Sequence, residues 1–328
     1  MTVRIAGAIG RYDRTWALLD GRVRPDGLEA TWLQLNPEQI FWRMIQHLEF
    51  DVAEMALASH VILRSRGSHD FVGIPAFLSR AFRHDAFYVS ASSGVRAPAD
   101  LRGKRIGVPE YQMTTAVWLR GLLEDEYGVA PGEIEWLQGS LEQPGRIIHT
   151  PVAPPGVRLS LIPPDKTLAG MLLGGELDAL MSPRMPSVFR EHRGKVERLF
   201  ADPWLEARSY FERTRIFPIM HLVVIRGDLV RENPWLPQTL YQAFLTAKTL
   251  ADDDLVDPTA LRTGLPFLVE QAEWVADHMG SDAWTYGVDE NRHVLEEYIR
   301  LSVHQGLIDA PLPIDTLFAV TTQRVSRI

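Results

Sequence analysis

The chain has 328 residues, of which 46% are hydrophobic, and a formal net charge of −8 at pH 7. This length is enough to bury the cores of two lobes, and the acidic balance argues against a nucleic-acid-binding protein, which usually carries a basic patch. The absence of cysteine excludes disulfides, thiolate catalysis and cysteine-ligated metals. No segment approaches about 18 uncharged apolar residues, and the N-terminus has no signal-peptide pattern. We therefore expect a soluble cytoplasmic protein with no membrane partner.

Strand-like and helix-like segments alternate through the first hundred residues. The run VRIAGA at residues 3–8 predicts a buried strand, and a short helix is predicted to end at Gly21. After a second strand, Asn36, Pro37 and Gln39 are typical of the N-cap, first position and capping box of a helix. Further strands are predicted at residues 50–56, 71–76 and 85–90, and a further helix at 60–67. The alternation indicates parallel pairing with right-handed crossovers.

A second series of alternating elements follows. Strands are predicted at residues 104–108, 134–140 and 159–163, a helix at 114–127, and a helix, turn and strand over 167–183. The strand that begins at residue 219 is predicted to return to the first lobe, and helices follow it. The sequence therefore predicts an α/β fold of two lobes with mixed sheets flanked by helices. The predicted lobes are 1–106 with 222–328, and 107–221, with a ligand in the cleft between them.

The common motifs for metals, nucleotides and covalent catalysis are missing from the sequence. The ten histidines show no His-x-His or His-x-x-x-His pairing. The glycines in LRGKRIG and LLGGELD match neither the Walker nor the dinucleotide pattern, and there is no Gly-x-Ser-x-Gly. We therefore expect no metal and no cofactor.

Two strands carry a titratable residue in an apolar run. Glu54 lies in FDVAEMA, where an unpaired buried carboxylate would be costly, so it is either functional or part of a structural ion pair. Ser59 follows at the carboxyl end of the same strand, where a ligand would bind. His221 lies in FPIMHLVV and is either a cleft residue or a core histidine.

Polar groups also gather between the strand at 104–108 and the helix after it. Free backbone N–H groups near Thr114 and Thr115 would form an anion site, and Tyr111 and Gln112 lie in the same loop. The alternative is ordinary capping of the helix by threonine.

Three cationic side chains, Arg80, Arg83 and His84, crowd together before a predicted strand. Arginine grips a carboxylate through two parallel hydrogen bonds, so the cluster indicates an anionic ligand. An extended segment over residues 82–89 would place His84 and Arg83 on opposite faces. In that case Arg83 shares a face with Asp85, and a local ion pair between them is the alternative.

Several segments resemble the 4,5-dihydroxyphthalate decarboxylase family, and the likeness spans nearly the whole chain. The family itself is similar in fold to type II periplasmic binding proteins, which agrees with the two predicted lobes. The segments that carry the resemblance are YDRT (12–15), EFDVAEMALASH (49–60), SRAFRHDAFYV (79–89), LRGKRIGVPEYQMTTAVWLRGLL (101–123), IFPIMHLVVIR (216–226) and NPWLPQTLYQAF (233–244).

The resemblance implies cofactor-independent decarboxylation of a hydroxylated aromatic acid, with 4,5-dihydroxyphthalate converted to 3,4-dihydroxybenzoate (protocatechuate). Such chemistry needs a proton delivered to the ring carbon that bears the carboxyl group. We expect His84 as the donor, His221 as the second candidate, and Glu54 as the third or as the base for the para-hydroxyl. Arg80 and Arg83 are expected to hold the retained carboxylate.

The remaining candidates are assigned to substrate binding. Tyr12, Asp13 and Ser59 are expected at the ring hydroxyls, and Tyr111, Gln112, Thr114 and Thr115 are further cleft residues. Two other functions stay open at this point: a cytoplasmic protein that binds an aromatic carboxylate without catalysis, and another small-molecule enzyme on this fold. The helices of the last hundred residues are compatible with a homo-oligomer or with packing on the first lobe.

Overall fold

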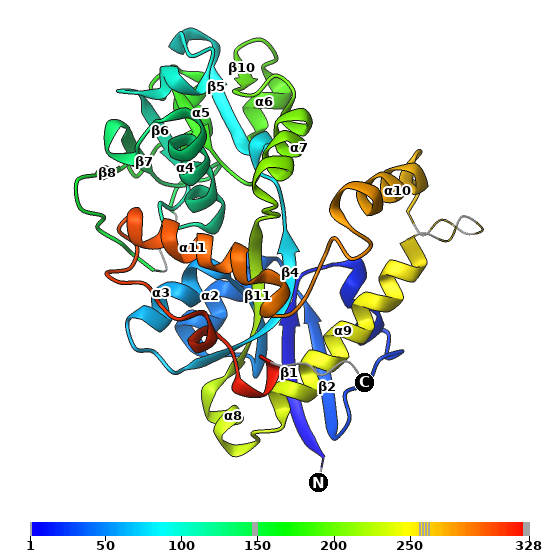
Figure 1. The fold of residues 1–328 in the computed structure, drawn as a ribbon. Coiled ribbons are helices and arrows are strands. Elements are labelled where there is room, and N and C mark those ends of the chain that lie inside the picture. Colours follow the sequence, from blue (N-terminus) through cyan, green and yellow to red (C-terminus); the bar gives the residue numbers. More distant parts are fainter. Residues whose placement is uncertain are drawn as a thin grey trace. The chain divides into compact units, whose positions relative to one another are not determined.

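A computed structural model describes residues 2–145, 150–255, 257, 259, 261 and 263–323. The chain divides into two compact units (Figure 1). The first unit comprises Met1–Arg80, Ile219–His293 and Leu312–Ile328, and the second comprises Ala81–Pro218 and Val294–Pro311. Within the described residues, no helix is long and apolar enough to cross a membrane.

The first unit contains a five-stranded mixed sheet in the order β2-β1-β3-β11-β4. β1 runs parallel to β2 and β3, whereas β11 is antiparallel to β3 and β4, so the strand that returns late in the chain lies between two early strands. The strands are β1 (Val3–Ile9), β2 (Leu28–Gln34), β3 (Val52–Ala56), β4 (Phe71–Arg80) and β11 (Ile219–Arg226). In Figure 1 the first three are blue, β4 is cyan and β11 is yellow-green.

Helices flank this sheet. α9 packs on β2 through an edge-to-face contact of Phe244 with Trp32, whose ring centroids are 5.6 Å apart. The helices are α1 (Trp16–Leu19), α2 (Pro37–His47), α3 (Leu57–Ser65), α8 (Gly227–Glu232), α9 (Leu236–Leu255) and α10 (Leu268–Met279).

The start of α2 shows how the local sequence sets an element. The side chain of Asn36 accepts a hydrogen bond from the Glu38 N–H, and Pro37 occupies the first turn, which confirms the predicted N-cap. Ile40 and Met44, four residues apart on one face, are fully buried.

The second unit contains a six-stranded mixed sheet in the order β10-β5-β9-β6-β7-β8. β6 is parallel to β7 and β9, and β7 to β8, as the alternating pattern predicts, while β5 is antiparallel to β9 and β10. The strands are β5 (Phe87–Ser90), β6 (Arg105–Val108), β7 (Glu135–Gln138), β8 (Arg158–Leu161), β9 (Ala179–Met181) and β10 (Val196–Arg198).

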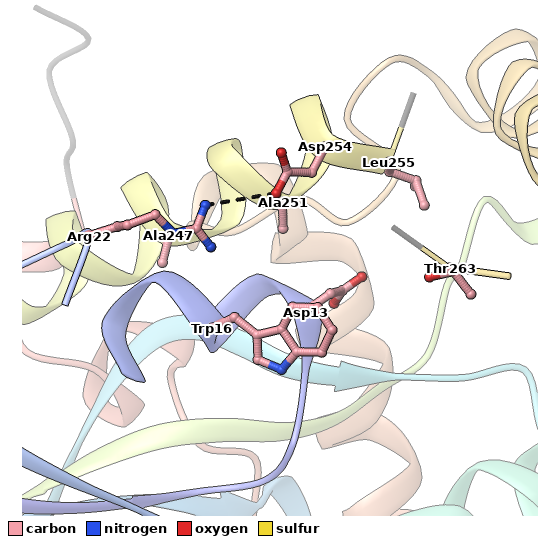
Figure 2. A pocket seen from close by; sticks show the side chains of 8 residues that line it. All are labelled: Asp13, Trp16, Arg22, Ala247, Ala251, Asp254, Leu255 and Thr263. Atoms are coloured by element: carbon pink, nitrogen blue, oxygen red, sulfur yellow. Dashed lines mark ion pairs between the residues drawn. The ribbon is translucent and has the colours of Figure 1, made fainter. Parts of the chain in front are cut away.

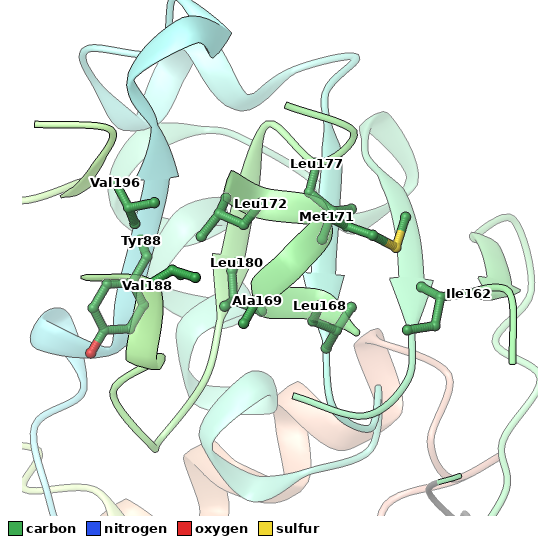
Figure 3. Packing of buried hydrophobic residues seen from close by; sticks show 10 residues of the cluster. All are labelled: Tyr88, Ile162, Leu168, Ala169, Met171, Leu172, Leu177, Leu180, Val188 and Val196. Atoms are coloured by element: carbon green, nitrogen blue, oxygen red, sulfur yellow. The ribbon is translucent and has the colours of Figure 1, made fainter. Parts of the chain in front are cut away.

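A hydrophobic core forms between this sheet and α5 (Leu168–Leu173). Leu168 and Leu172 of α5 and Leu180 of β9 are fully buried and belong to one cluster with Val188 (Figure 3). The other helices are α4 (Thr114–Tyr127), α6 (Ser187–Glu191), α7 (Pro203–Thr214) and α11 (Arg292–His304), of which α11 belongs to this unit from Val294 onward.

The strand predicted at residues 85–90 begins at Phe87, and the extended conformation considered for residues 82–89 is not observed. β4 continues to Arg80, and a 3₁₀ turn over His84–Ala86 precedes β5. The Ala86 N–H donates to the Arg83 carbonyl at 2.9 Å, which closes a turn with a period of about three residues instead of two. The argument that placed His84 and Arg83 on opposite faces of a strand therefore does not hold.

Candidate functional site

Glu54 lies in the middle of β3 with no solvent exposure, and its carboxylate accepts three hydrogen bonds. The Gly10 N–H donates to Oε2 at 2.7 Å, and the Tyr12 hydroxyl donates to Oε1 at 2.6 Å. Nδ1 of His221 lies 2.6 Å from Oε1. Because an ionised carboxylate can only accept, Nδ1 of His221 carries the proton.

The sheet brings these residues together from distant parts of the chain. In the antiparallel register of β3 and β11, Val223 faces Glu54 and His221 faces Ala56. Glu54 and His221 are therefore diagonal neighbours on one face, within reach of a long side chain. Gly10 follows the carboxyl end of β1, the parallel neighbour of β3 on its other side.

The charge state of this group follows from its surroundings. Burial alone would raise the pKa of Glu54, but the hydrogen bonds and charge of His221, with the bonds from Tyr12 and Gly10, hold that pKa below its ordinary value. Burial and then the Glu54 charge raise the pKa of the Tyr12 phenol well above its ordinary value. Glu54 is therefore an anion at neutral pH, and Tyr12 remains a hydrogen-bond donor to it.

His221, like Tyr12, is partly accessible to solvent. Its side chain is 19% exposed, against 0% for Glu54. The imidazole packs edge-to-face on Phe41 of α2, with ring centroids 4.9 Å apart, and within the described residues its Nε2 makes no hydrogen bond. A buried carboxylate on one nitrogen and an open second nitrogen are the arrangement of a general acid or base.

Arg80 and Ser59 are further candidates in the first unit. Nη2 of Arg80 donates to the Thr285 carbonyl at 2.7 Å and to the Asn291 side chain, and burial lowers the pKa of Arg80 to about 9. Ser59 is half-buried in the first turn of α3. Arg80 and Ser59 as substrate-binding residues stay predictions.

Asp13 is exposed and bound to its neighbour Arg14, whose Nη1 donates to it at 2.9 Å. It lines a small pocket with Trp16 and with Ala251 and Asp254 of α9 (Figure 2). That pocket holds about 30 Å³, which suits a water molecule and not an aromatic ring.

His84 and Arg83 belong to the second unit. The His84 imidazole is 4% exposed and lies between Phe200 and Tyr210, with both pairs of ring centroids 5.6 Å apart. Burial, aided by the Arg213 charge, lowers the pKa of His84 to about 4. This imidazole is therefore neutral at neutral pH. Arg83 is half-buried.

The four candidates around the start of α4 also lie in the second unit. The Tyr111 N–H donates to the Gln138 side chain at 2.6 Å, and the Gln112 amide donates to Glu110 at 2.7 Å. Thr114 and Thr115 are buried in the first turn of α4. The N-cap position itself is taken by Met113, so threonine does not cap this helix.

Comparisons with known proteins show the family to which the chain belongs. A curated 4,5-dihydroxyphthalate decarboxylase from Comamonas testosteroni is 39% identical over 317 residues, which cover 96% of both chains. The chain belongs to the 4,5-dihydroxyphthalate decarboxylase family. A second decarboxylase of the same name, from Pseudomonas putida, is 40% identical over 210 residues, covering 62% of this chain and 81% of that protein. The predicted resemblance is confirmed, although no family model matches the chain.

Solved structures show that this family member has the fold of the periplasmic binding proteins, as predicted. A sulfonate-binding protein from Methylobacillus flagellatus matches with a TM-score of 0.56 and 14% identity, covering 97% of this chain and 91% of that one. A Candida albicans protein described as having the generic periplasmic binding protein fold matches with a TM-score of 0.57 and 9% identity, covering 99% and 98%. At these identities the likeness shows the fold alone.

Sequence reasoning missed two contributors to the site of this decarboxylase family member. Gly10 supplies a backbone donor to Glu54, and a side-chain carbon there would lie 2.8 Å from Glu54 Oε2. A glycine directly after a buried strand is the signal that could have indicated such a close approach. Phe41 packs on His221 from α2, and its position in an amphipathic helix gave no comparable signal.

Proposed function

We propose that this protein decarboxylates a hydroxylated aromatic acid without a cofactor, 4,5-dihydroxyphthalate being converted to 3,4-dihydroxybenzoate, and that Glu54 and His221 carry out the proton transfer. The observation that supports the reaction most strongly is the 39% identity to a 4,5-dihydroxyphthalate decarboxylase over 96% of both chains. The observation that supports the choice of these two residues is that the buried Glu54 carboxylate binds Nδ1 of the partly exposed His221 imidazole.

The reaction exchanges a carbon–carbon bond for a carbon–hydrogen bond. One proton adds to the ring carbon that bears the carboxylate, while the para-hydroxyl donates electron density and keeps its own proton, so that the ring becomes a protonated cyclohexadienone. The carbon–carbon bond then breaks, CO2 leaves, and its bonding electron pair restores the aromatic ring. Substrate and one proton therefore give product and CO2, with no oxidation.

His221 is better placed than His84 to donate that proton. Histidine is the commonest general acid because it exchanges protons near neutral pH. The ionised Glu54 at Nδ1 stabilises a charged imidazolium, so that Nε2–H can be given to the ring carbon. His84 lacks a carboxylate partner among the described residues, and burial lowers its pKa to about 4, so it does not carry the acidic imidazolium proton at neutral pH.

Glu54 has the supporting part in this mechanism. Its three donors keep it ionised, so it orients His221 and balances the imidazolium charge instead of donating a proton itself. Tyr12 contributes through its hydrogen bond to Glu54. The residues that hold the retained carboxylate stay a prediction, with Arg80 and Arg83 as the candidates from the sequence.

The test compares His221→Gln with His84→Gln by the release of CO2 from 4,5-dihydroxyphthalate. Loss of a general acid costs on the order of 10²- to 10⁴-fold in kcat, and we expect this loss for His221→Gln. His84→Gln should keep most of its turnover and lose thermal stability, because a buried side chain is replaced. If His84→Gln loses turnover and His221→Gln keeps it, the assignment is wrong. If the wild type binds the diacid tightly and returns it unchanged, the protein is a binding protein.

A further inference from the structure

Arg14 is held between two aromatic rings next to the Glu54–His221 pair. The guanidinium carbon lies 4.4 Å from the centroid of the Tyr12 ring and 4.0 Å from that of Trp284. Only 13% of the Arg14 side chain is exposed. A guanidinium stacked on an aromatic face is attracted by the ring quadrupole, and more strongly when water is excluded.

The N–H groups of Arg14 fix this position. Nε donates to the Leu78 carbonyl at 2.9 Å, Nη2 donates to the same carbonyl, and Nη1 donates to Asp13 at 2.9 Å. Trp284 is anchored in the same place, because its Nε1 donates to the Phe77 carbonyl at 2.8 Å. Arg14 therefore binds the Leu78 carbonyl of β4, and Trp284 binds the carbonyl of the preceding residue, Phe77.

The Tyr12 ring lies against this assembly, and its hydroxyl is 2.6 Å from Glu54. We infer that Arg14 is a positioning residue, which holds the Tyr12 ring so that its hydroxyl stays on Glu54. The inference rests on the proposed function of the Glu54–His221 pair. In this role Arg14 acts indirectly, through Tyr12 and Glu54, and does not itself need to touch the reacting atoms.

Arginine is the residue that this place requires. Its planar group lies over both the Tyr12 and the Trp284 ring, while its N–H groups bind the Leu78 carbonyl and Asp13. A lysine ammonium keeps the charge and N–H donors but lacks the flat surface, so it cannot stack on the two rings as a guanidinium does.

A double-mutant cycle with Tyr12→Phe tests the inference on 4,5-dihydroxyphthalate. A misplacement of about 1 Å in a catalytic group can cost on the order of 10²-fold, so Arg14→Gln should lower kcat by that order and change KM little. If Arg14 acts through Tyr12, Arg14→Gln should cost nothing further in the Tyr12→Phe background. Losses that add in the double variant overturn the inference.

Two further variants keep the test decisive. Arg14→Lys retains the charge and a donor for Leu78, so it should fold, and it should still lose turnover; wild-type kinetics for it would exclude the stacking role. Arg22→Gln is the matched control, since Arg22 is a half-exposed arginine that binds its neighbour Asp20 at 2.9 Å, and it should leave kcat unchanged.

A spectroscopic reading separates this inference from the proposed function. With ¹³C-labelled tyrosine, the Tyr12 signal is assigned by its absence in Tyr12→Phe. Burial is the largest cause that raises the pKa of Tyr12, while the Arg14 charge is a smaller and opposite one. Release of the ring in Arg14→Gln should therefore bring its titration down toward the ordinary tyrosine value of about 10. An unchanged Tyr12 titration overturns the inference, whereas a wild type without turnover refutes only the proposed function.

Discussion

Gly10 serves the site both through its N–H and through its missing side chain. The N–H donates to Glu54 at 2.7 Å. A carbon added at this glycine would lie 2.7 Å from the Tyr12 ring and 2.8 Å from Glu54 Oε2, closer than real contacts allow. Gly10→Ala should therefore push both groups out of place, lowering kcat on the order of 10²-fold and stability by about 1–3 kcal/mol. Steady-state kinetics and thermal melting measure the two effects.

Gly264→Ala is the control for that experiment, because an added carbon there meets nothing within 4 Å. It should leave turnover as in the wild type. Wild-type kcat in Gly10→Ala would mean that Tyr12 and Glu54 can shift without consequence, which contradicts the geometry of the site.

At the scale of single residues, the sequence could indicate Glu54 and His221 separately but not that the two form a pair. A carboxylate in an apolar strand needs compensation, and that argument depends on a few neighbouring residues. The partner, His221, lies 167 residues further along the chain. His84 shows the opposite case: its cationic neighbours suggested a ligand, but Phe200 and Tyr210 enclose its ring from far along the chain.

At the scale of elements, α4 contains a glycine where alanine would favour the helix. A carbon added at Gly121 would lie 2.6 Å from both methyl carbons of Leu301 in α11, and Leu301 is itself buried. Gly121→Ala in an exposed helix would stabilise by about 1 kcal/mol. Here overpacking should prevail, and we expect a net loss of about 1–3 kcal/mol in the free energy of unfolding.

Chemical denaturation measures that loss, and Leu301→Val provides the rescue. The shorter side chain removes one methylene group from the crowded contact, so the double variant should be more stable than Gly121→Ala alone. If Gly121→Ala is as stable as the wild type or more so, α4 and α11 are not in close contact at this point.

Element prediction succeeded where the signal was local and failed where it was not. The N-cap of α2 depends on the adjacent residues Asn36 and Pro37, and it was predicted correctly. The strand predicted at residues 85–90 begins two residues later, at Phe87, because a turn over His84–Ala86 precedes it. Packing of this turn against α7, through Tyr210, is a tertiary effect that periodicity does not contain.

At the scale of the whole molecule, strand and helix alternation predicted the α/β class and the parallel pairs of β1 and of β6, and the family resemblance predicted the fold. The parallel pairing predicted for the strands that became β4 and β5 is wrong, because both pair antiparallel. The order of the strands could not be predicted in this way. β11 lies between β3 and β4 and pairs antiparallel with both. These pairs join residues more than a hundred positions apart, so local sequence patterns do not contain them. The site depends on this insertion, since β11 carries His221 to Glu54.

The whole molecule should lose stability in mild acid because each unit buries a histidine. His60 is fully buried in the first unit, and its Nε2 donates to the Leu317 carbonyl at 2.8 Å. Burial lowers its pKa to about 4, and His84 in the second unit has the same value for the same principal reason. Within the described residues, neither Nδ1 atom has an acceptor for an added proton.

The direction of this effect follows from proton binding. An unfolded histidine has a pKa of about 6.5, so between that value and about 4 the unfolded chain binds protons that the folded chain refuses. Stability is therefore present at neutral pH and is lost as the pH falls. From pH 7 to pH 5, His60 alone should cost on the order of 2 kcal/mol, and His84 acts in the same direction. Glu54, whose pKa is depressed, affects stability only at lower pH.

Denaturant unfolding at pH 7 and pH 5 measures the loss in the wild type and in His60→Gln. The glutamine can keep a donor for Leu317 but does not titrate, so the variant should lose less stability between the two pH values than the wild type. His47→Gln, at an exposed histidine, is the control and should show the wild-type difference. Equal pH dependence in His60→Gln and the wild type would mean that His60 accepts a proton in the folded state, which its enclosed site does not permit.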